Sequence, residues 1–144
     1  MNRVVPPAFL WPVRVYWEDT DAGGVVYYAN YLKFCERARS EWLRQLGIAQ
    51  QRLADEQSLL FVVSSASIQY HASARLDDAL QISVSIASRG AASLELLQQV
   101  RRAHPADDFQ QQPLLASVAV RIACVRAGDM RPQRLPAALL QALD

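Results

Sequence analysis

An apolar stripe at helical spacing runs through the first third of the chain, and alternating patterns dominate the rest. The stripe places Lys33, Arg37 and Arg44 on the opposite face, as in an amphipathic helix. Gly47 is a suitable C-terminal stop. The pattern therefore predicts one helix of about five turns, which is long for a chain of 144 residues. Its apolar positions are Tyr27, Tyr28, Tyr31, Phe34, Cys35, Ala38, Trp42 and Leu46.

From Leu59 onward the apolar period changes from helical spacing to two, which predicts strands. Turn-forming segments separate the runs, so the strands can follow one another as an antiparallel meander. The apolar face of such a sheet must be covered, and the early helix has the only large apolar stripe available. We therefore expect an α+β domain in which a sheet curls around one helix. The four alternating runs lie at 66–70, 80–86, 94–100 and 115–125.

Three shorter elements complete the expected domain. Trp11 to Trp17 is rich in valine and aromatic residues, which favours a further strand. Ile48 to Gln57 is predicted to hold a second short helix, and Leu135 to Leu143 a terminal helix opened by Pro136. The sheet then has about five strands. Because neither a repeat nor an internal linker interrupts the pattern, residues 1–144 are predicted to form a single domain.

Composition narrows the classes of function. The net charge of +1 does not indicate a protein that binds nucleic acid or a membrane surface. Cys35 and Cys124 form no metal-binding spacing, and the two histidines are too scattered for a metal cluster, so no metal is expected. The N-terminal segment, residues 1–10, does not have the pattern of a signal peptide. A cytoplasmic protein with reduced thiols is the expectation.

A short acidic and glycine-containing motif precedes the helix. Asp21 and the Gly23-Gly24 pair stand immediately before the first helical turn. The free N–H groups of a helix start can bind a carbonyl oxygen, and a carboxylate beside them can act on the carbonyl carbon. This arrangement suggests acyl-transfer chemistry. The alternative interpretation of Asp21 is an ordinary turn or capping residue.

These features resemble the hot-dog fold of the 4-hydroxybenzoyl-CoA thioesterase-like acyl-CoA thioesterases, and most closely their YbgC-type branch, which is linked to the Tol–Pal envelope system. The longest matching stretch is Glu18–Tyr27. Shorter patches occur in the same order and span most of the domain. These are 29–34, 36–39, 74–78, 92–94 and 121–125.

The resemblance implies a thioesterase without a cofactor. It implies that Asp21 is the catalytic carboxylate, acting as nucleophile or as base for water, and that the Tyr28 backbone N–H polarises the thioester oxygen. Many YbgC-type sequences have histidine where this chain has Tyr28. The backbone donor survives that change, because every residue except proline has an N–H. The resemblance also implies dimers or tetramers, a homotetramer among them, with active sites at the subunit boundary.

Further residues are candidates for substrate binding. Gly23, Gly24 and Val25 would let the backbone pass close to an acyl chain. Ser65 and Ser67 lie where the strand of a neighbouring subunit could border the pocket, although strand-surface serines are usually structural. The candidate ligands for the CoA phosphates are Arg89, Arg126, Arg131 and Arg134, and for each of them an ordinary solvated arginine is the alternative.

The leading hypothesis is hydrolysis of acyl-CoA, in lipid metabolism, with acyl carrier protein as a possible further partner. A hot-dog dehydratase is a weaker hypothesis, because such enzymes use a histidine near the central helix and none precedes His71. A non-catalytic acyl-binding or scaffolding protein is the alternative from another class. The carboxylate of Asp21 argues against it, since a pocket that only buries an acyl chain gains nothing from a carboxylate.

Overall fold

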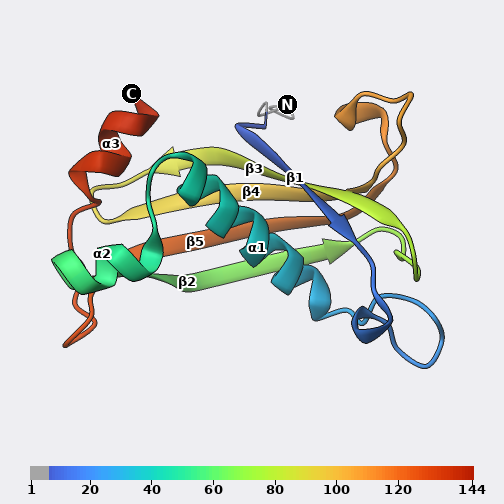
Figure 1. Cartoon of the computed structure of the whole chain (residues 1–144), viewed down its shortest axis with the longest axis horizontal. Helices are drawn as coiled ribbons and strands as arrows, with labels where there is room; N and C mark the ends of the chain where they lie inside the picture. Colours follow the sequence, from blue (N-terminus) through green and yellow to red (C-terminus); the bar gives the residue numbers. More distant parts are fainter. Residues whose placement is uncertain (1–6) are drawn as a thin grey trace.

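A computed structural model describes residues 7–144 as a five-stranded antiparallel sheet with one long helix lying across a face (Figure 1). Residues 1–6, part of the segment predicted not to be a signal peptide, lie outside the described residues. The elements in chain order are β1 (Phe9–Arg14), η1 (Trp17–Asp19), α1 (Asn30–Gln45), α2 (Gln50–Gln57), β2 (Leu59–Tyr70), β3 (Ala79–Arg89), β4 (Ser93–Arg102), η2 (Phe109–Gln111), β5 (Leu114–Arg126) and α3 (Ala137–Leu143).

The apolar stripe of α1 is buried against the sheet, as the sequence predicts. Phe34, Cys35, Ala38 and Trp42 are almost inaccessible to solvent, and the helix lies against β1, β3 and β4. Burial raises the pKa of the Cys35 thiol to about 12, so this cysteine is a core residue and not a nucleophile. The helix ends at the predicted stop, because Gly47 has a φ of +88°.

The predicted start of the helix is wrong by three residues. Tyr27 and Tyr28 do not lie on the buried stripe but in a turn before α1, where their side chains are 47% and 61% exposed. The reason is a backbone hydrogen bond, 2.9 Å long, from the Tyr27 N–H to the Asp19 carbonyl. This bond pairs Tyr27 with the segment before the turn, so the helix begins only at Asn30.

The predicted four-strand meander is also wrong. Only β3, β4 and β5 follow one another as neighbours, and the strand order is β1-β3-β4-β5-β2. The segment 71–78 does not reverse as a hairpin. Ala74 accepts a hydrogen bond from the Val26 N–H at 2.9 Å, and Asp78 accepts one from the Val15 N–H at 2.9 Å. These contacts carry the chain past the start of α1 to the other side of the sheet, leaving β2 as an edge strand paired only with β5.

The first strand is shifted from its predicted position. It spans Phe9–Arg14, not Trp11 to Trp17, and Trp17 begins the η1 turn with its side chain 81% exposed. The Asp19 carboxylate accepts a hydrogen bond from the Tyr16 N–H at 2.8 Å, which turns the chain out of the sheet. The other short helices, α2 and α3, form where the sequence predicts them. Among residues 7–144, no helix has the length and apolar character needed to cross a membrane.

Candidate active site

The turn before α1 fixes the position of Asp21. The Asp21 N–H donates to the Val25 carbonyl at 2.8 Å, and the Gly24 N–H donates to the Asp21 carbonyl at 3.1 Å. The Asp21 carboxylate also accepts the Gly23 N–H at 2.8 Å. Gly24 has a φ of +79°, a left-handed conformation that favours glycine. The Gly23-Gly24 pair is therefore part of the turn that presents the carboxylate.

A test of this turn is the substitution Gly24→Ala. An added Cβ would meet no atom within 4 Å, so the effect comes from the backbone conformation alone. We expect the free energy of unfolding to fall by about 1 to 2 kcal/mol, the typical cost of a left-handed conformation for a residue with a side chain. Urea unfolding measures this change. The control is Gly128→Ala, which has open space and no positive φ. An equal loss in both variants would contradict the role of backbone strain at Gly24.

Asp19 and Asn30 join this turn to the helix. The Asp19 carboxylate is 5% exposed and accepts a hydrogen bond from the Asn30 side chain at 3.1 Å. Because Asp19 also accepts the Tyr16 N–H, its carboxylate is satisfied from within the fold. Asp19 is a structural residue, and Asp21 is the carboxylate left facing solvent.

The turn between Tyr27 and α1 leaves two backbone donors free. The Tyr27 N–H is bound to the Asp19 carbonyl, and the Asn30 N–H donates to the Tyr27 carbonyl at 2.8 Å. Between them, neither the Tyr28 N–H nor the Ala29 N–H makes a hydrogen bond within residues 7–144. A free N–H just before a helix start is a suitable donor for an oxygen that carries negative charge.

Asp21, Val25 and Tyr28 line one cavity of about 460 Å³ at this end of the molecule. Tyr70 and His71, from the end of β2, border the same cavity. The cavity brings a carboxylate and a free backbone donor into one space, and Asp21 is the only carboxylate among its lining residues. The lining is completed by Val26, Tyr27, Tyr31, Ala72 and Ser73.

The tyrosines of this cavity pack on one another. The ring centroids of Tyr27 and Tyr28 lie 4.8 Å apart, and those of Tyr31 and Tyr70 lie 5.6 Å apart. The Tyr31 hydroxyl accepts the Ala74 N–H at 2.9 Å, and the pKa of Tyr31 is raised, mainly by burial. These side chains are neutral and carry hydroxyl groups, so the cavity offers aromatic surface beside a single negative charge.

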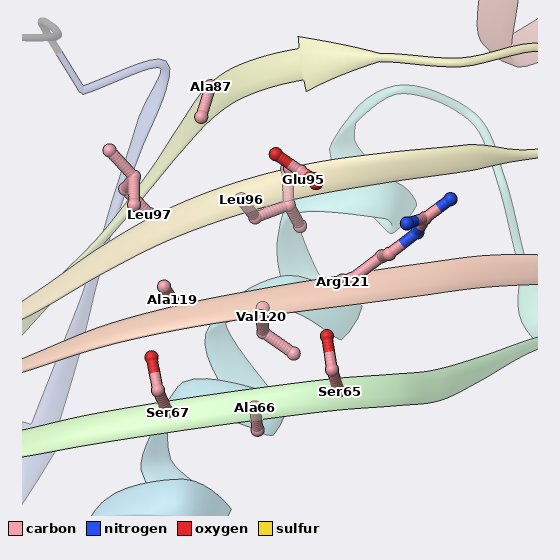
Figure 2. A pocket seen from close by; sticks show the side chains of 10 residues that line it. All are labelled: Ser65, Ala66, Ser67, Ala87, Glu95, Leu96, Leu97, Ala119, Val120 and Arg121. Atoms are coloured by element: carbon pink, nitrogen blue, oxygen red, sulfur yellow. The ribbon is translucent and has the colours of Figure 1, made fainter.

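The remaining predicted site residues lie elsewhere in the protomer. Ser65 and Ser67 point from β2 into a separate cavity of about 270 Å³, on the face of the sheet opposite α1 (Figure 2). Glu95 of β4 and Arg121 of β5 line the same cavity. Arg89 ends β3 and is paired with Asp144 at 3.1 Å. Within one protomer, the structure does not bring these three predicted residues to Asp21.

Residues at the end of β2 were missed as site residues from the sequence. His71 lines the Asp21 cavity, and its Nε2 lies 3.0 Å from the Ser117 hydroxyl. The alternating pattern identifies Tyr70 and His71 only as neighbouring positions of a strand. The sequence carries only a weak signal for these two residues. The strand order places the end of β2 near the start of α1, and the alternating pattern does not reveal that order.

The arrangement fits attack on an activated carbonyl. A thioester carbon is electrophilic and a thiolate leaves readily, so such a site needs a nucleophile or base on one side and a hydrogen-bond donor at the oxygen on the other. Asp21 and the Tyr28 N–H have these two properties. No group of three or more histidine, cysteine, aspartate or glutamate side chains suited to hold a metal ion occurs in the part of the chain that the structure describes.

Comparison with known proteins identifies the family. A family model described as the thioesterase-like superfamily matches residues 15–143. The chain belongs to this superfamily. The acyl-CoA thioesterase YbgC of Haemophilus influenzae is 44% identical over 128 residues, which are 89% of this chain and 88% of that protein.

Solved structures of the superfamily have the same fold. A probable thioesterase from Bartonella henselae is 35% identical, with a TM-score of 0.78 over 90% of this chain and all of that one. A 4-hydroxybenzoyl-CoA thioesterase superposes with a TM-score of 0.84 at 19% identity, covering 94% of this chain and 97% of that one. The family and the hot-dog fold predicted from the motif are thus confirmed.

Proposed function

We propose that this protein hydrolyses acyl-CoA thioesters to a free acid and CoA. One observation carries the proposal: the Asp21 carboxylate and the unpaired Tyr28 N–H line the same cavity at the start of α1. Membership of a thioesterase superfamily and the 44% identity to a protein named acyl-CoA thioesterase support it. The proposed chemistry uses residues of the chain and a water molecule.

In the proposed reaction, the thioester carbonyl lies between Asp21 and Tyr28. Asp21 acts in one of two ways. As a nucleophile, its carboxylate attacks the carbonyl carbon, CoA leaves as a thiolate, and water then hydrolyses the mixed anhydride. As a base, it takes a proton from the water that attacks. In both routes the Tyr28 N–H binds the oxyanion, an interaction worth about 3 to 4 kcal/mol of the barrier in comparable sites. The partial positive charge of the helix start acts in the same direction.

We further propose that the working enzyme is a homo-oligomer, a dimer or tetramer. The strand β2 is an edge strand of 12 residues, paired on one side only within the protomer. Pairing with a second copy would cover this edge. Within one protomer, Ser65, Ser67 and Arg89 do not lie beside Asp21. In an assembly, they could contact the substrate bound by a second protomer. We expect light scattering at micromolar concentration to give at least twice the mass of one chain; a monomeric mass would contradict the proposal.

The substrate has two parts in this proposal. Val25, which lines the cavity, is proposed to border the path of the acyl group, and Gly23 and Gly24 form the adjoining turn. Arg89 is proposed to bind the CoA phosphates. Acyl carrier protein would present the same thioester on the same pantetheine arm and is a further proposed partner. We place the enzyme in the cytoplasm and in lipid metabolism. The two buried free thiols, Cys35 and Cys124, are consistent with a reducing compartment.

The test is release of free thiol from a panel of thioesters. The panel comprises acetyl-CoA, hexanoyl-CoA, palmitoyl-CoA and benzoyl-CoA, together with the matching acyl carrier protein thioesters. We expect steady turnover of at least one member, with one thiol formed per acid released. Absence of thiol release from every member would reject hydrolysis and favour an acyl-binding or scaffolding protein.

A further inference from the structure

The hydroxyl of Tyr70 makes a long-range contact with the turn before α1. It donates a hydrogen bond of 2.9 Å to the Tyr28 carbonyl, across 42 positions of sequence. Tyr70 is the last residue of β2, and its ring packs edge-on against Tyr28, with ring centroids 6.3 Å apart. A side chain of the edge strand is therefore bonded to the cavity-lining residue that has a free N–H.

This bond restrains the Tyr28 carbonyl, which belongs to the peptide group after the one that carries the Tyr28 N–H. Before Tyr28, the Tyr27 N–H is bound to Asp19 and the Tyr27 carbonyl to Asn30. After it, the Tyr28 carbonyl accepts the Tyr70 hydroxyl, and within residues 7–144 it has no other partner. The Tyr28 N–H shares a planar peptide group with the Tyr27 carbonyl, which the Asn30 N–H binds, so the Tyr70 bond is a second restraint on the direction of this N–H.

The ring of Tyr70, which is 45% exposed, packs on a second tyrosine of the cavity. Its ring lies 5.6 Å from that of Tyr31, whose hydroxyl is bound to the Ala74 N–H. The pKa of Tyr70 is raised, first by partial burial and then by the neighbouring Tyr28 and Tyr31. The hydroxyl is thus protonated at neutral pH, as a donor to a carbonyl must be.

We propose that Tyr70 is a positioning residue for thioester hydrolysis, which aims the Tyr28 N–H at the thioester oxygen through its hydrogen bond to the Tyr28 carbonyl. The inference rests on the proposed function. Tyr70 acts on the transition state through Tyr28, because the hydrogen bond from the Tyr28 N–H is strongest when negative charge develops on the thioester oxygen. Loss of the bond should therefore lower kcat more than it changes KM.

The test compares Tyr70→Phe with Tyr16→Phe and Asp21→Asn, each assayed with the panel member that the wild type hydrolyses fastest. Tyr70→Phe removes the hydroxyl and keeps the ring. We expect kcat to fall about ten- to hundredfold, as for a small misplacement of a catalytic group, with KM within about threefold of wild type. Tyr16 is 62% exposed and outside the cavity lining, so the same change there should leave both constants unchanged.

A second measurement keeps the inference testable apart from turnover. The Ala29 nitrogen shares a peptide bond with the Tyr28 carbonyl, so the NMR shift of the Ala29 amide reports the Tyr70 bond directly. We expect this resonance to move in Tyr70→Phe and to stay in place in Tyr16→Phe. An unmoved resonance would overturn the inference. The inference would also be overturned if Tyr70→Phe had the kcat of the wild type, or if its KM rose while its kcat stayed unchanged.

The outcomes separate this inference from the proposed function. If Asp21→Asn is inactive while Tyr70→Phe turns over at the wild-type rate, the hydrolase stands and the role of Tyr70 is rejected. If Asp21→Asn retains full activity, or if the wild type releases no thiol, the proposed site fails and the inference fails with it.

Discussion

Replacement of Asp21 by asparagine or alanine is expected to lower kcat for thioester hydrolysis by about a hundredfold or more, with the fold retained. Either change removes the only carboxylate of the cavity, so neither nucleophilic attack nor proton abstraction from water can proceed as proposed. The fold should survive because Asp21 is exposed, and its one side-chain hydrogen bond is to the nearby Gly23 N–H. Thiol release and thermal melting measure the two expectations.

The chain offers a matched control for the turn geometry of Asp21. The Asp129 carboxylate accepts the N–H of Arg131, two residues on, at 3.1 Å, as Asp21 accepts that of Gly23. Asp129 does not line the Asp21 cavity. Asp129→Asn should therefore leave kcat unchanged. Full activity in Asp21→Asn or Asp21→Ala would remove Asp21 from the mechanism.

The largest expected effect on stability is that of Trp42→Ala. Trp42 lies on the buried stripe of α1 and is 2% exposed, so its removal leaves a large cavity between the helix and the sheet. We expect the free energy of unfolding to fall by about 3 to 5 kcal/mol, the usual cost of truncating a buried aromatic residue. Urea unfolding followed by far-UV circular dichroism gives this value.

Trp17→Ala is the corresponding control, because Trp17 is 81% exposed and its backbone carbonyl, which the substitution keeps, accepts hydrogen bonds from Thr20. Its unfolding free energy should lie within about 0.5 kcal/mol of wild type, as is usual for surface changes. Similar losses in the two variants would contradict the assignment of Trp42 to the central core.

The apolar periodicities predicted the helices and strands well, because a helix or strand depends on residues that are close together in the sequence. The stripe from Tyr31 to Trp42 is buried against the sheet, and the positive φ of Gly47 marks the end of the helix. The start of the helix was mispredicted because Tyr27 and Tyr28 fit the spacing equally well. The bond from Tyr27 to Asp19 excludes them, and apolar spacing does not reveal such a bond.

The strand order and part of the site depend on distant contacts. Strands separated by turn residues suggest hairpins, and the hydrogen bonds between the segment after Tyr70 and the 15–26 segment leave no mark in the local pattern. The motif was sufficient to nominate Asp21 and Tyr28, which lie close together in sequence. Tyr70 and His71 reach the same cavity only through the crossover, so they could be found only in the structure.

The most direct test is a crystal structure of the Asp21→Asn variant with the acyl-CoA that the wild type hydrolyses fastest. We predict an intact thioester in the cavity at the start of α1, with its carbonyl oxygen about 2.7 to 3.1 Å from the Tyr28 nitrogen and its carbonyl carbon facing the side chain at position 21. A thioester bound elsewhere, for example on the outer face of the sheet beside Ser65 and Ser67, would contradict the proposed mechanism.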